Sequence, residues 1–237
     1  MIDLKDIKGI IFDYGGTIDT NGDHWAEVLW DAYKKFDVPV NKEQFRNAYV
    51  LAERAMAKFP YVRTDFDFKD VLRVKIDLEL SFLEEDGAMV FHEINHRKLC
   101  LQLSSWCYSY VRNVLQDTRM VVNTLAQNRK LVLVSNFYGN IQTILKDFDL
   151  DRYFQEVIES SVVGVRKPDP AIYQMGIDAM GLPAENILVV GDSYGKDMEP
   201  AMILGCHTAW IKGREWKHEE HDESKIDFVI TDLKQLI

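Results

Sequence analysis

The chain has 237 residues, of which 47% are apolar, and a formal net charge of −10. This length and apolar fraction are sufficient for one large or two modest domains with a hydrophobic core. The negative charge, without a cluster of Lys and Arg, argues against a nucleic-acid partner, and no apolar stretch is long enough to span a membrane.

The N-terminal segment and the cysteines indicate a compartment. The first nine residues, MIDLKDIKG, alternate charged with apolar side chains and lack the continuous apolar core of a signal peptide. Cys100 and Cys107 would lie about 10 Å apart on one helix, too far apart for a disulfide. With Cys206 they form no disulfide framework, so we expect a cytoplasmic protein with free thiols.

A short apolar strand is predicted at Ile10–Phe12, and it leads directly into Asp13 and a pair of glycines. Gly15 and Gly16 carry no Cβ and can adopt positive φ, so the backbone after Asp13 can turn tightly around a small ligand. Open α/β sheets bind their ligands at the carboxyl ends of the strands. Asp13 is therefore predicted to lie in a functional site.

The segment 20–112 contains no convincing strand. Its apolar residues recur at helical spacing, and Asn41 and Pro60 are typical of a helix start and a helix stop. Helices are predicted at 25–36, 41–58, 68–84 and 88–111. Because the flanking segments do contain strands, we predict a helical unit over 20–112, inserted into an α/β domain formed by 1–19 and 113–237.

The rest of the chain alternates between predicted strands and predicted helices. Strands are predicted at 131–135, 154–158, 187–190, 207–211 and 228–230, and helices at 118–127, 141–148, 170–180 and 198–204. Right-handed crossovers between these strands give a doubly wound, Rossmann-like parallel sheet. The strand ends at 13, 135 and 191 are expected to converge on one edge of that sheet.

Four motifs occur in the order found in the haloacid dehalogenase-like hydrolase superfamily. Asp13-Tyr14-Gly15-Gly16-Thr17 resembles the first motif, and Ser135 after an apolar strand resembles the second. Lys167 in RKPDP resembles the third motif, and Gly191-Asp192-Ser193 with Asp197 resembles the fourth. The resemblance covers nearly the whole chain, although 20–112 matches only as a helical cap. In that superfamily such an insert is mobile and closes over the active site.

A divalent metal is expected beside Asp13. Asp13, Asp192 and Asp197 would form a cluster of negative charge that cannot stay ionised without a cation, and oxygen ligands suit Mg²⁺. The resemblance implies that Asp13, Asp192 and the backbone carbonyl of Gly15 bind the metal directly, while Asp197 supports them.

The same resemblance implies a phosphatase that acts on a small phosphorylated metabolite. Asp13 would be the nucleophile and would form an aspartyl-phosphate. Lys167 and Ser135, together with nearby backbone N–H groups, would neutralise and position the phosphoryl group, and Asn136 is assigned to the same substrate-binding set.

Gly15 departs from the pattern of this superfamily. Its phosphatases usually carry an Asp two residues after the nucleophile, which protonates the leaving group and then activates water. Glycine can do neither, and general acid–base catalysis contributes about 10²–10⁴-fold to a rate. Asp19 and His24 are the nearest candidates in sequence for a substitute acid.

The departure leaves other functions open. Phosphonoacetaldehyde hydrolases of the superfamily have a small residue at this position and use a cap lysine as a Schiff base, for which Lys58 is a candidate. Haloacid dehalogenases also lack the Asp, yet they attack carbon without a metal, so Asp192 and Asp197 argue against that function. A regulatory protein that binds metal or phosphate without turnover is a third alternative.

A zinc-protease motif, HExxH, occurs at 92–96 on a predicted helix. Two charged residues, Arg97 and Lys98, follow it directly, and the sequence shows no third ligand. We interpret this segment as the solvated face of a helix.

Overall fold

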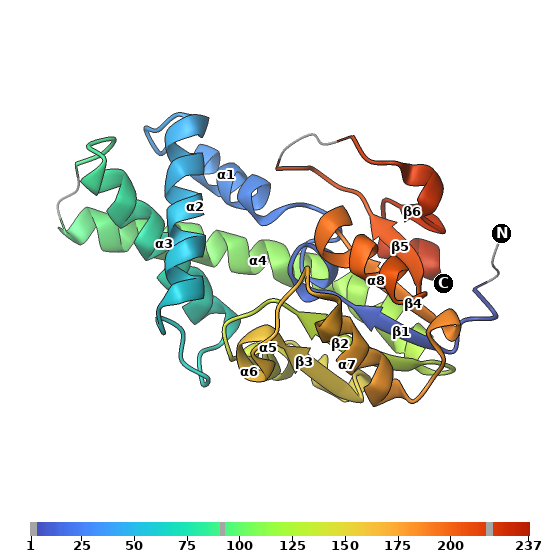
Figure 1. Cartoon of the computed structure of the whole chain (residues 1–237). Coiled ribbons are helices and arrows are strands. Elements are labelled where there is room, and N and C mark those ends of the chain that lie inside the picture. The colour runs from blue at the N-terminus through green and yellow to red at the C-terminus, as the bar shows by residue number, and fades with distance from the viewer. Residues whose placement is uncertain (1–3, 91–92, 217–219) are drawn as a thin grey trace.

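The computed structural model describes residues 4–90, 93–216 and 220–237. It consists of a parallel sheet with helices on both faces and a helical unit at one end of that sheet (Figure 1). The predicted α/β class with an inserted helical unit is confirmed.

The sheet has six strands in the order β3-β2-β1-β4-β5-β6, and every neighbouring pair is parallel. The strands are β1 (Gly9–Phe12), β2 (Lys130–Ser135), β3 (Glu156–Glu159), β4 (Ile187–Gly191), β5 (His207–Ile211) and β6 (Phe228–Ile230). Phe12 lies in register with Leu133 of β2 and Val190 of β4. The chain therefore leaves β1 at Asp13 between the ends of two neighbouring strands.

Alternate side chains of the strands face opposite layers of helices, as a doubly wound sheet requires. Ile11 and its neighbours in β2 and β4 pack with α7 (Pro170–Met180) and α8 (Glu199–Ile203). Ile10 and Phe12 face the other layer, which contains α5 (Ile141–Asp147) and the C-terminal part of α4 (Glu93–Ala126). The short helix α6 (Ser160–Val163) follows β3.

The helical unit is formed by α1 (Trp25–Lys35), α2 (Lys42–Lys58), α3 (Phe68–Glu85) and the first part of α4. The predicted start of α2 is confirmed, because Asn41 accepts hydrogen bonds from the first turn and forms a capping box with Gln44. In the described part of the chain, no helix is both long and apolar enough to cross a membrane. The three cysteines are buried free thiols, as expected.

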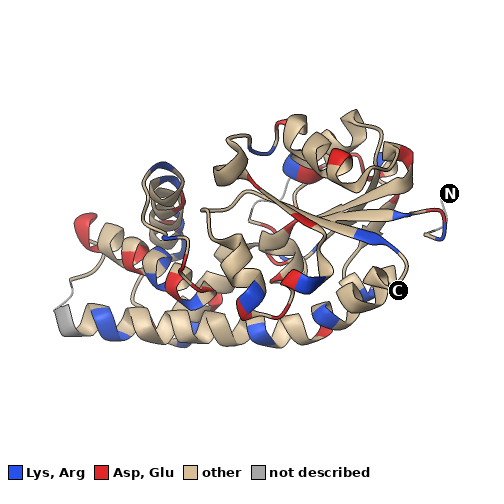
Figure 2. Ribbon diagram, turned by 90° about the horizontal axis from the view of Figure 1, so that it is seen from below, with Lys and Arg blue, Asp and Glu red and all other residues tan. Residues whose placement is uncertain are grey.

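The prediction of separate helices at 88–111 and 118–127 is wrong, because α4 is one helix of 34 residues. No Pro or Gly interrupts it, and the hydroxyl of Thr118, the expected start of a new helix, donates to the backbone carbonyl oxygens of Ile18 and Val114. Figure 2 shows α4 running beneath both parts of the molecule, with charges of both signs along it. The expected domain boundary at 112 therefore falls inside a continuous helix.

A carboxyl group is buried in the core of the helical unit. Glu79 of α3 is fully buried, and its Oε2 accepts a hydrogen bond of 3.1 Å from the Tyr33 hydroxyl. Its Oε1 has no hydrogen-bond partner among the described residues. Burial raises the pKa of Glu79 to about 8, although Lys75, one turn earlier, and Tyr33 lower it. The folded chain thus holds this carboxyl in its neutral form at neutral pH.

The raised pKa of Glu79 predicts that stability falls as the pH rises. An unfolded glutamate releases its proton near pH 4.5, whereas the folded one retains it up to about pH 8, so this contribution is complete below 4.5 and is lost as the pH approaches 8. We expect Glu79→Gln to reduce the difference in Tm between pH 5 and pH 8. Glu85→Gln, an exposed change on the same helix, is the control. Equal pH dependence in wild type and Glu79→Gln would contradict the prediction.

Candidate active site

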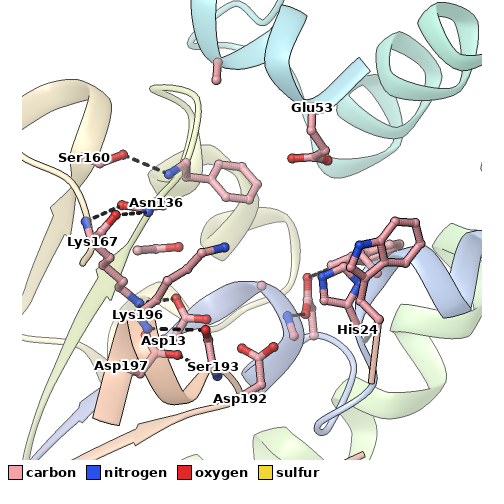
Figure 3. A pocket seen from close by; sticks show the side chains of 18 of the residues that line it. Asp13, His24, Glu53, Asn136, Ser160, Lys167, Asp192, Ser193, Lys196 and Asp197 are labelled. Atoms are coloured by element: carbon pink, nitrogen blue, oxygen red, sulfur yellow. Dashed lines mark hydrogen bonds and ion pairs between the residues drawn. The ribbon is translucent and has the colours of Figure 1, made fainter. Parts of the chain in front are cut away.

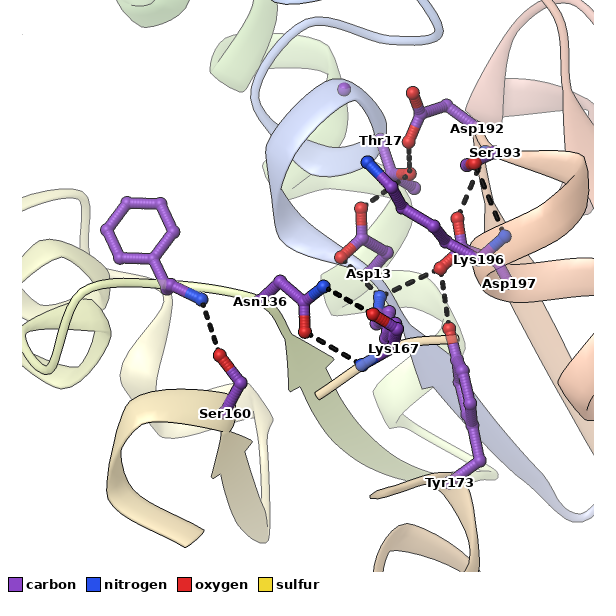
Figure 4. Close-up of polar contacts among 12 residues, drawn as sticks. Asp13, Thr17, Asn136, Ser160, Lys167, Tyr173, Asp192, Ser193, Lys196 and Asp197 are labelled. Atoms are coloured by element: carbon purple, nitrogen blue, oxygen red, sulfur yellow. Dashed lines mark hydrogen bonds and ion pairs between the residues drawn. The ribbon is translucent and has the colours of Figure 1, made fainter. Parts of the chain in front are cut away.

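The carboxyl edge of the sheet brings the predicted site residues together (Figure 4). Asp13 follows β1, Ser135 ends β2, Asp192 follows β4, and Lys167 lies in the loop before α7. All four line one cavity of about 1150 Å³, which extends from the sheet edge to the helical unit. The convergence predicted from the strand ends is confirmed.

Lys167 is held between two carboxylates. Its Nζ lies 2.6 Å from Oδ1 of Asp13 and 2.8 Å from Oδ1 of Asp197, and all three residues are buried. Burial alone would lower the pKa of Lys167, but Asp13 and Asp197 outweigh it and raise that pKa. The ammonium group is therefore charged and fixed beside Asp13.

Asp197 has little capacity left for a further ligand. Besides Lys167, its Oδ1 accepts a hydrogen bond of 2.7 Å from the Tyr173 hydroxyl, and its Oδ2 accepts one of 3.0 Å from the backbone N–H of Ser193. These contacts fit the supporting role expected of Asp197. Sequence reasoning missed Tyr173, because nothing local distinguishes it from other core tyrosines.

The side chain of Asn136 holds the backbone of Lys167. Its amide nitrogen donates a hydrogen bond of 3.1 Å to the Lys167 carbonyl oxygen, and its Oδ1 accepts one of 2.9 Å from the Lys167 backbone N–H. This pair of hydrogen bonds fixes the loop that carries the ammonium group. A direct contact of Asn136 or of the buried Ser135 with substrate stays a prediction.

The carboxylates of Asp13, Asp192 and Asp197 offer oxygens that all lie within 4.8 Å of one another. Lys167 pairs with Asp13 and Asp197, whereas no ion pair of Asp192 with Lys or Arg occurs among the described residues. Burial raises the pKa of Asp192 well above its ordinary value, and the charges of Asp13 and Asp197 raise it further. Lys167 and Lys196 lower that pKa but do not outweigh the burial. The excess negative charge and the all-oxygen donors suit a hard divalent cation.

Asp13 and Asp192 are better placed than Asp197 to bind a metal ion. Oδ2 of Asp13 and Oδ1 of Asp192 share one hydrogen-bond donor, the Thr17 hydroxyl, at the long distances of 3.5 Å and 3.3 Å. Both oxygens of Asp197 already accept hydrogen bonds. This division of roles agrees with the ligand set that the sequence motifs imply.

The two glycines after Asp13 have different conformations. Gly16 has φ +95°, and a Cβ there would lie 2.4 Å from Oδ2 of Asp192, so only glycine fits. Gly15 has φ −77° and ψ 116°, and a Cβ there would have no atom within 4 Å. Positive φ, allowed for both from the sequence, is used only by Gly16, and Gly15 has room for a side chain.

Asp19, a candidate for the missing acid, stabilises the turn that follows β1. Its Oδ1 accepts a hydrogen bond of 2.8 Å from the Gly16 N–H, and its Oδ2 accepts one of 2.8 Å from Nε1 of Trp25. Burial raises the pKa of Asp19 to about 7, although these two hydrogen bonds lower it. Both oxygens are engaged in holding the loop in this conformation.

His24, the second candidate, starts α1. Its Nδ1 accepts a hydrogen bond of 3.1 Å from the N–H of Ala26, and its ring stacks on Trp216 at 5.6 Å between centroids. Burial lowers the pKa of His24 to about 4. The imidazole is therefore neutral at physiological pH and is anchored by the start of the helix.

The alternative sites are less well formed. Lys58, the candidate for a Schiff base, is exposed at the margin of the cavity with its Nζ over the Phe59 ring. In the HExxH segment, His92 lies outside the described residues, and His96 contacts Asp77 at 3.0 Å. Elsewhere in the described chain, no group of three or more metal-ligating side chains occurs besides the aspartate cluster.

Comparisons with known proteins identify the family of the chain. Residues 7–202 match the family model described as haloacid dehalogenase-like hydrolase. The chain is 33% identical to a glyceraldehyde 3-phosphate phosphatase of Pyrococcus furiosus, over 99% of this chain and 93% of that protein. It is 27% identical to a phosphoglycolate phosphatase of Aliivibrio fischeri, over 99% and 96% of the two chains.

A solved structure extends the likeness to the whole fold. The putative hydrolase YfnB from Bacillus subtilis, whose structure is described as bound to magnesium, aligns with a TM-score of 0.57 at 18% identity. The alignment covers 97% of this chain and 96% of that one. The helical unit is included in this likeness, which concerns the fold alone.

Proposed function

The chain belongs to the haloacid dehalogenase-like hydrolases and is an enzyme, and we propose that it is a Mg²⁺-dependent phosphatase of a small phosphorylated metabolite. The observation that carries the proposal is the placement of Asp13. One of its oxygens is held by Lys167 at 2.6 Å, and the other faces Asp192 at the floor of a large cavity. This arrangement supports a carboxylate nucleophile with a cation site beside it.

The residues suggest two half-reactions. An oxygen of Asp13 attacks phosphorus, the bond from phosphorus to the leaving oxygen breaks, and the leaving alkoxide takes a proton from water. Water then cleaves the aspartyl-phosphate and regenerates the carboxylate. Lys167 offsets negative charge in both steps. A Mg²⁺ ion, held by Asp13, Asp192 and the Gly15 carbonyl, would supply further neutralisation of the phosphoryl oxygens.

The relatives support a phosphatase without specifying the substrate. Two of them are named for phosphate esters, and a structural neighbour is described as bound to magnesium. Phosphoglycolate carries a carboxylate beyond its phosphate, whereas glyceraldehyde 3-phosphate carries uncharged groups. The names therefore leave the chemistry of the leaving group open.

The other functions considered from the sequence receive less support. A dehalogenase needs no cation, so this function does not explain the cluster of carboxylates around Asp192. A Schiff-base hydrolase needs a desolvated, uncharged lysine, whereas Lys58 is exposed and the buried Lys75 is held as an ammonium ion by its ion pair with Glu53. A purely regulatory role is tested by turnover itself.

Metal dependence tests the proposal directly. We expect EDTA to abolish phosphate release and Mg²⁺ to restore it. At about one hundred times its Kd, Mg²⁺ should stabilise the wild type by about 2.7 kcal/mol, which corresponds to a rise in Tm of roughly 5 °C or more. Asp192→Asn should lose both effects, because the variant lacks one of the two available carboxylate ligands.

Asp178→Asn is the matched control, since Asp178 lies on the exposed face of α7, away from the cavity. It should keep the metal-induced rise in Tm. Phosphate release that persists after thorough chelation would contradict the proposed mechanism and would favour metal-free chemistry at Asp13.

A further inference from the structure

An ion pair lies inside the cavity on the side of the helical unit. Lys75 of α3 pairs with Oε1 of Glu53 of α2, and both residues line the same cavity as Asp13. Figure 3 shows Glu53 projecting into the cavity from the helical unit, across from Asp13. Lys75 is only 8% exposed, whereas the Glu53 side chain is 34% exposed, so the ammonium group is shielded from bulk water and the carboxylate is open to the cavity. Sequence periodicity does not reveal this pair, because the two residues lie on different helices.

The walls around the pair are aromatic. The Nζ of Lys75 lies 5.8 Å from the ring centroid of Tyr49, 5.9 Å from that of Tyr138 and 6.0 Å from that of Trp25. The Tyr138 hydroxyl also donates a hydrogen bond of 3.2 Å to Oε2 of Glu53. The pair therefore offers hydrogen-bond donors and an acceptor but no net charge, within a surface of ring faces.

The pair is connected to the turn that follows Asp13. Trp25, which contributes one ring face, donates its Nε1 hydrogen bond to Asp19. Asp19 in turn accepts from the N–H of Gly16. The aromatic wall is thus fixed relative to the nucleophile, and a substrate phosphorylated at one end would extend from Asp13 toward Lys75 and Glu53.

We propose that the Lys75–Glu53 pair selects phosphate esters whose leaving group is uncharged and hydroxylated, an inference that rests on the proposed phosphatase function. A hydroxyl can accept from Lys75 and donate to Glu53 while the pair stays intact. A second anion on the substrate would have to displace Glu53 from Lys75 or lie against the Glu53 carboxylate, and both arrangements bring two negative charges together beside one ammonium group. The ring faces suit the C–H surfaces of a polyol or sugar.

Matched pairs of substrates test this selection. In one pair, 2-hydroxyethyl phosphate and phosphoglycolate differ only by an alcohol against a carboxylate, and sorbitol 6-phosphate and 6-phosphogluconate repeat the comparison on a longer chain. For each pair that is hydrolysed, we expect the wild type to prefer the alcohol by about tenfold or more in kcat/KM. This measurement needs no variant.

Two variants separate charge from shape. Glu53→Gln leaves Lys75 with an uncompensated charge, so the preference for the alcohol should fall by about tenfold or reverse. The double variant with Glu53→Gln and Lys75→Gln removes both charges, and its preference should remain on the side of the alcohol. Glu43→Gln, an exposed change on the same helix, should match the wild type.

The outcomes distinguish this inference from the proposed function. If neither these esters nor p-nitrophenyl phosphate releases phosphate in the presence of Mg²⁺, the proposed phosphatase function itself is contradicted. Hydrolysis of p-nitrophenyl phosphate combined with a wild-type preference for the carboxylates overturns only the role of the pair. An unchanged preference in a folded Glu53→Gln variant also overturns that role.

Discussion

Asp13→Asn is expected to reduce kcat for phosphate release by roughly 10⁴-fold or more, because an amide cannot act as the nucleophile. The intact mass of the wild type, quenched during turnover, should show a fraction of chains that carry one phosphoryl group. The variant should show none. Both measurements follow directly from the placement of the Asp13 carboxylate beside Lys167.

The loss should not result from unfolding. The amide oxygen that Asp13→Asn introduces can still accept from Lys167, and Lys167 keeps its ion pair with Asp197. The substitution also removes one of three clustered carboxylates, so the metal-free variant should melt no lower than the metal-free wild type. Asp178→Asn should leave both turnover and the phosphoryl adduct unchanged. Substantial turnover by folded Asp13→Asn would exclude Asp13 as the nucleophile.

Gly15→Asp is expected to accelerate hydrolysis of alkyl phosphates by about 10²–10⁴-fold, the usual contribution of a general acid and base. Gly15 has a backbone conformation open to any residue, lines the cavity, and has no atom within 4 Å of the position that a Cβ would take. The new carboxyl group could therefore protonate the leaving oxygen and then activate water. The gain should be smaller for p-nitrophenyl phosphate, whose leaving group needs no proton.

Gly15→Asn is the matched control, since it has the same shape without a titratable carboxyl and should give no acceleration. In the wild type, slow dephosphorylation of Asp13 should produce a burst followed by a slow steady state. A wild type that hydrolyses alkyl phosphates rapidly without a burst, with no gain in folded Gly15→Asp, would show that another group supplies the proton. Asp19→Asn and His24→Gln would then be the variants to measure.

The sequence by itself determined the strands of the sheet and the residues at the carboxyl edge where the candidate site lies. Apolar runs that end in Asp13, Ser135 and Gly191-Asp192 are local patterns, and parallel strands place such ends together whatever the rest of the chain does. The start of α2 at Asn41 was equally predictable, because capping depends on neighbours along the chain. The order of the motifs also indicated the family.

The tertiary structure decided everything that depends on contacts between distant segments. The continuity of α4 across 112 depends on its packing against both parts of the molecule, so periodicity alone suggested two helices. Gly15 and Gly16 are the same type of residue, and only the position of Asp192 in the structure shows which of them must lack a side chain. Lys75 and Glu53 form a pair because α2 and α3 bring them together at the cavity, and the spacing of residues along either helix alone gives no sign of that contact.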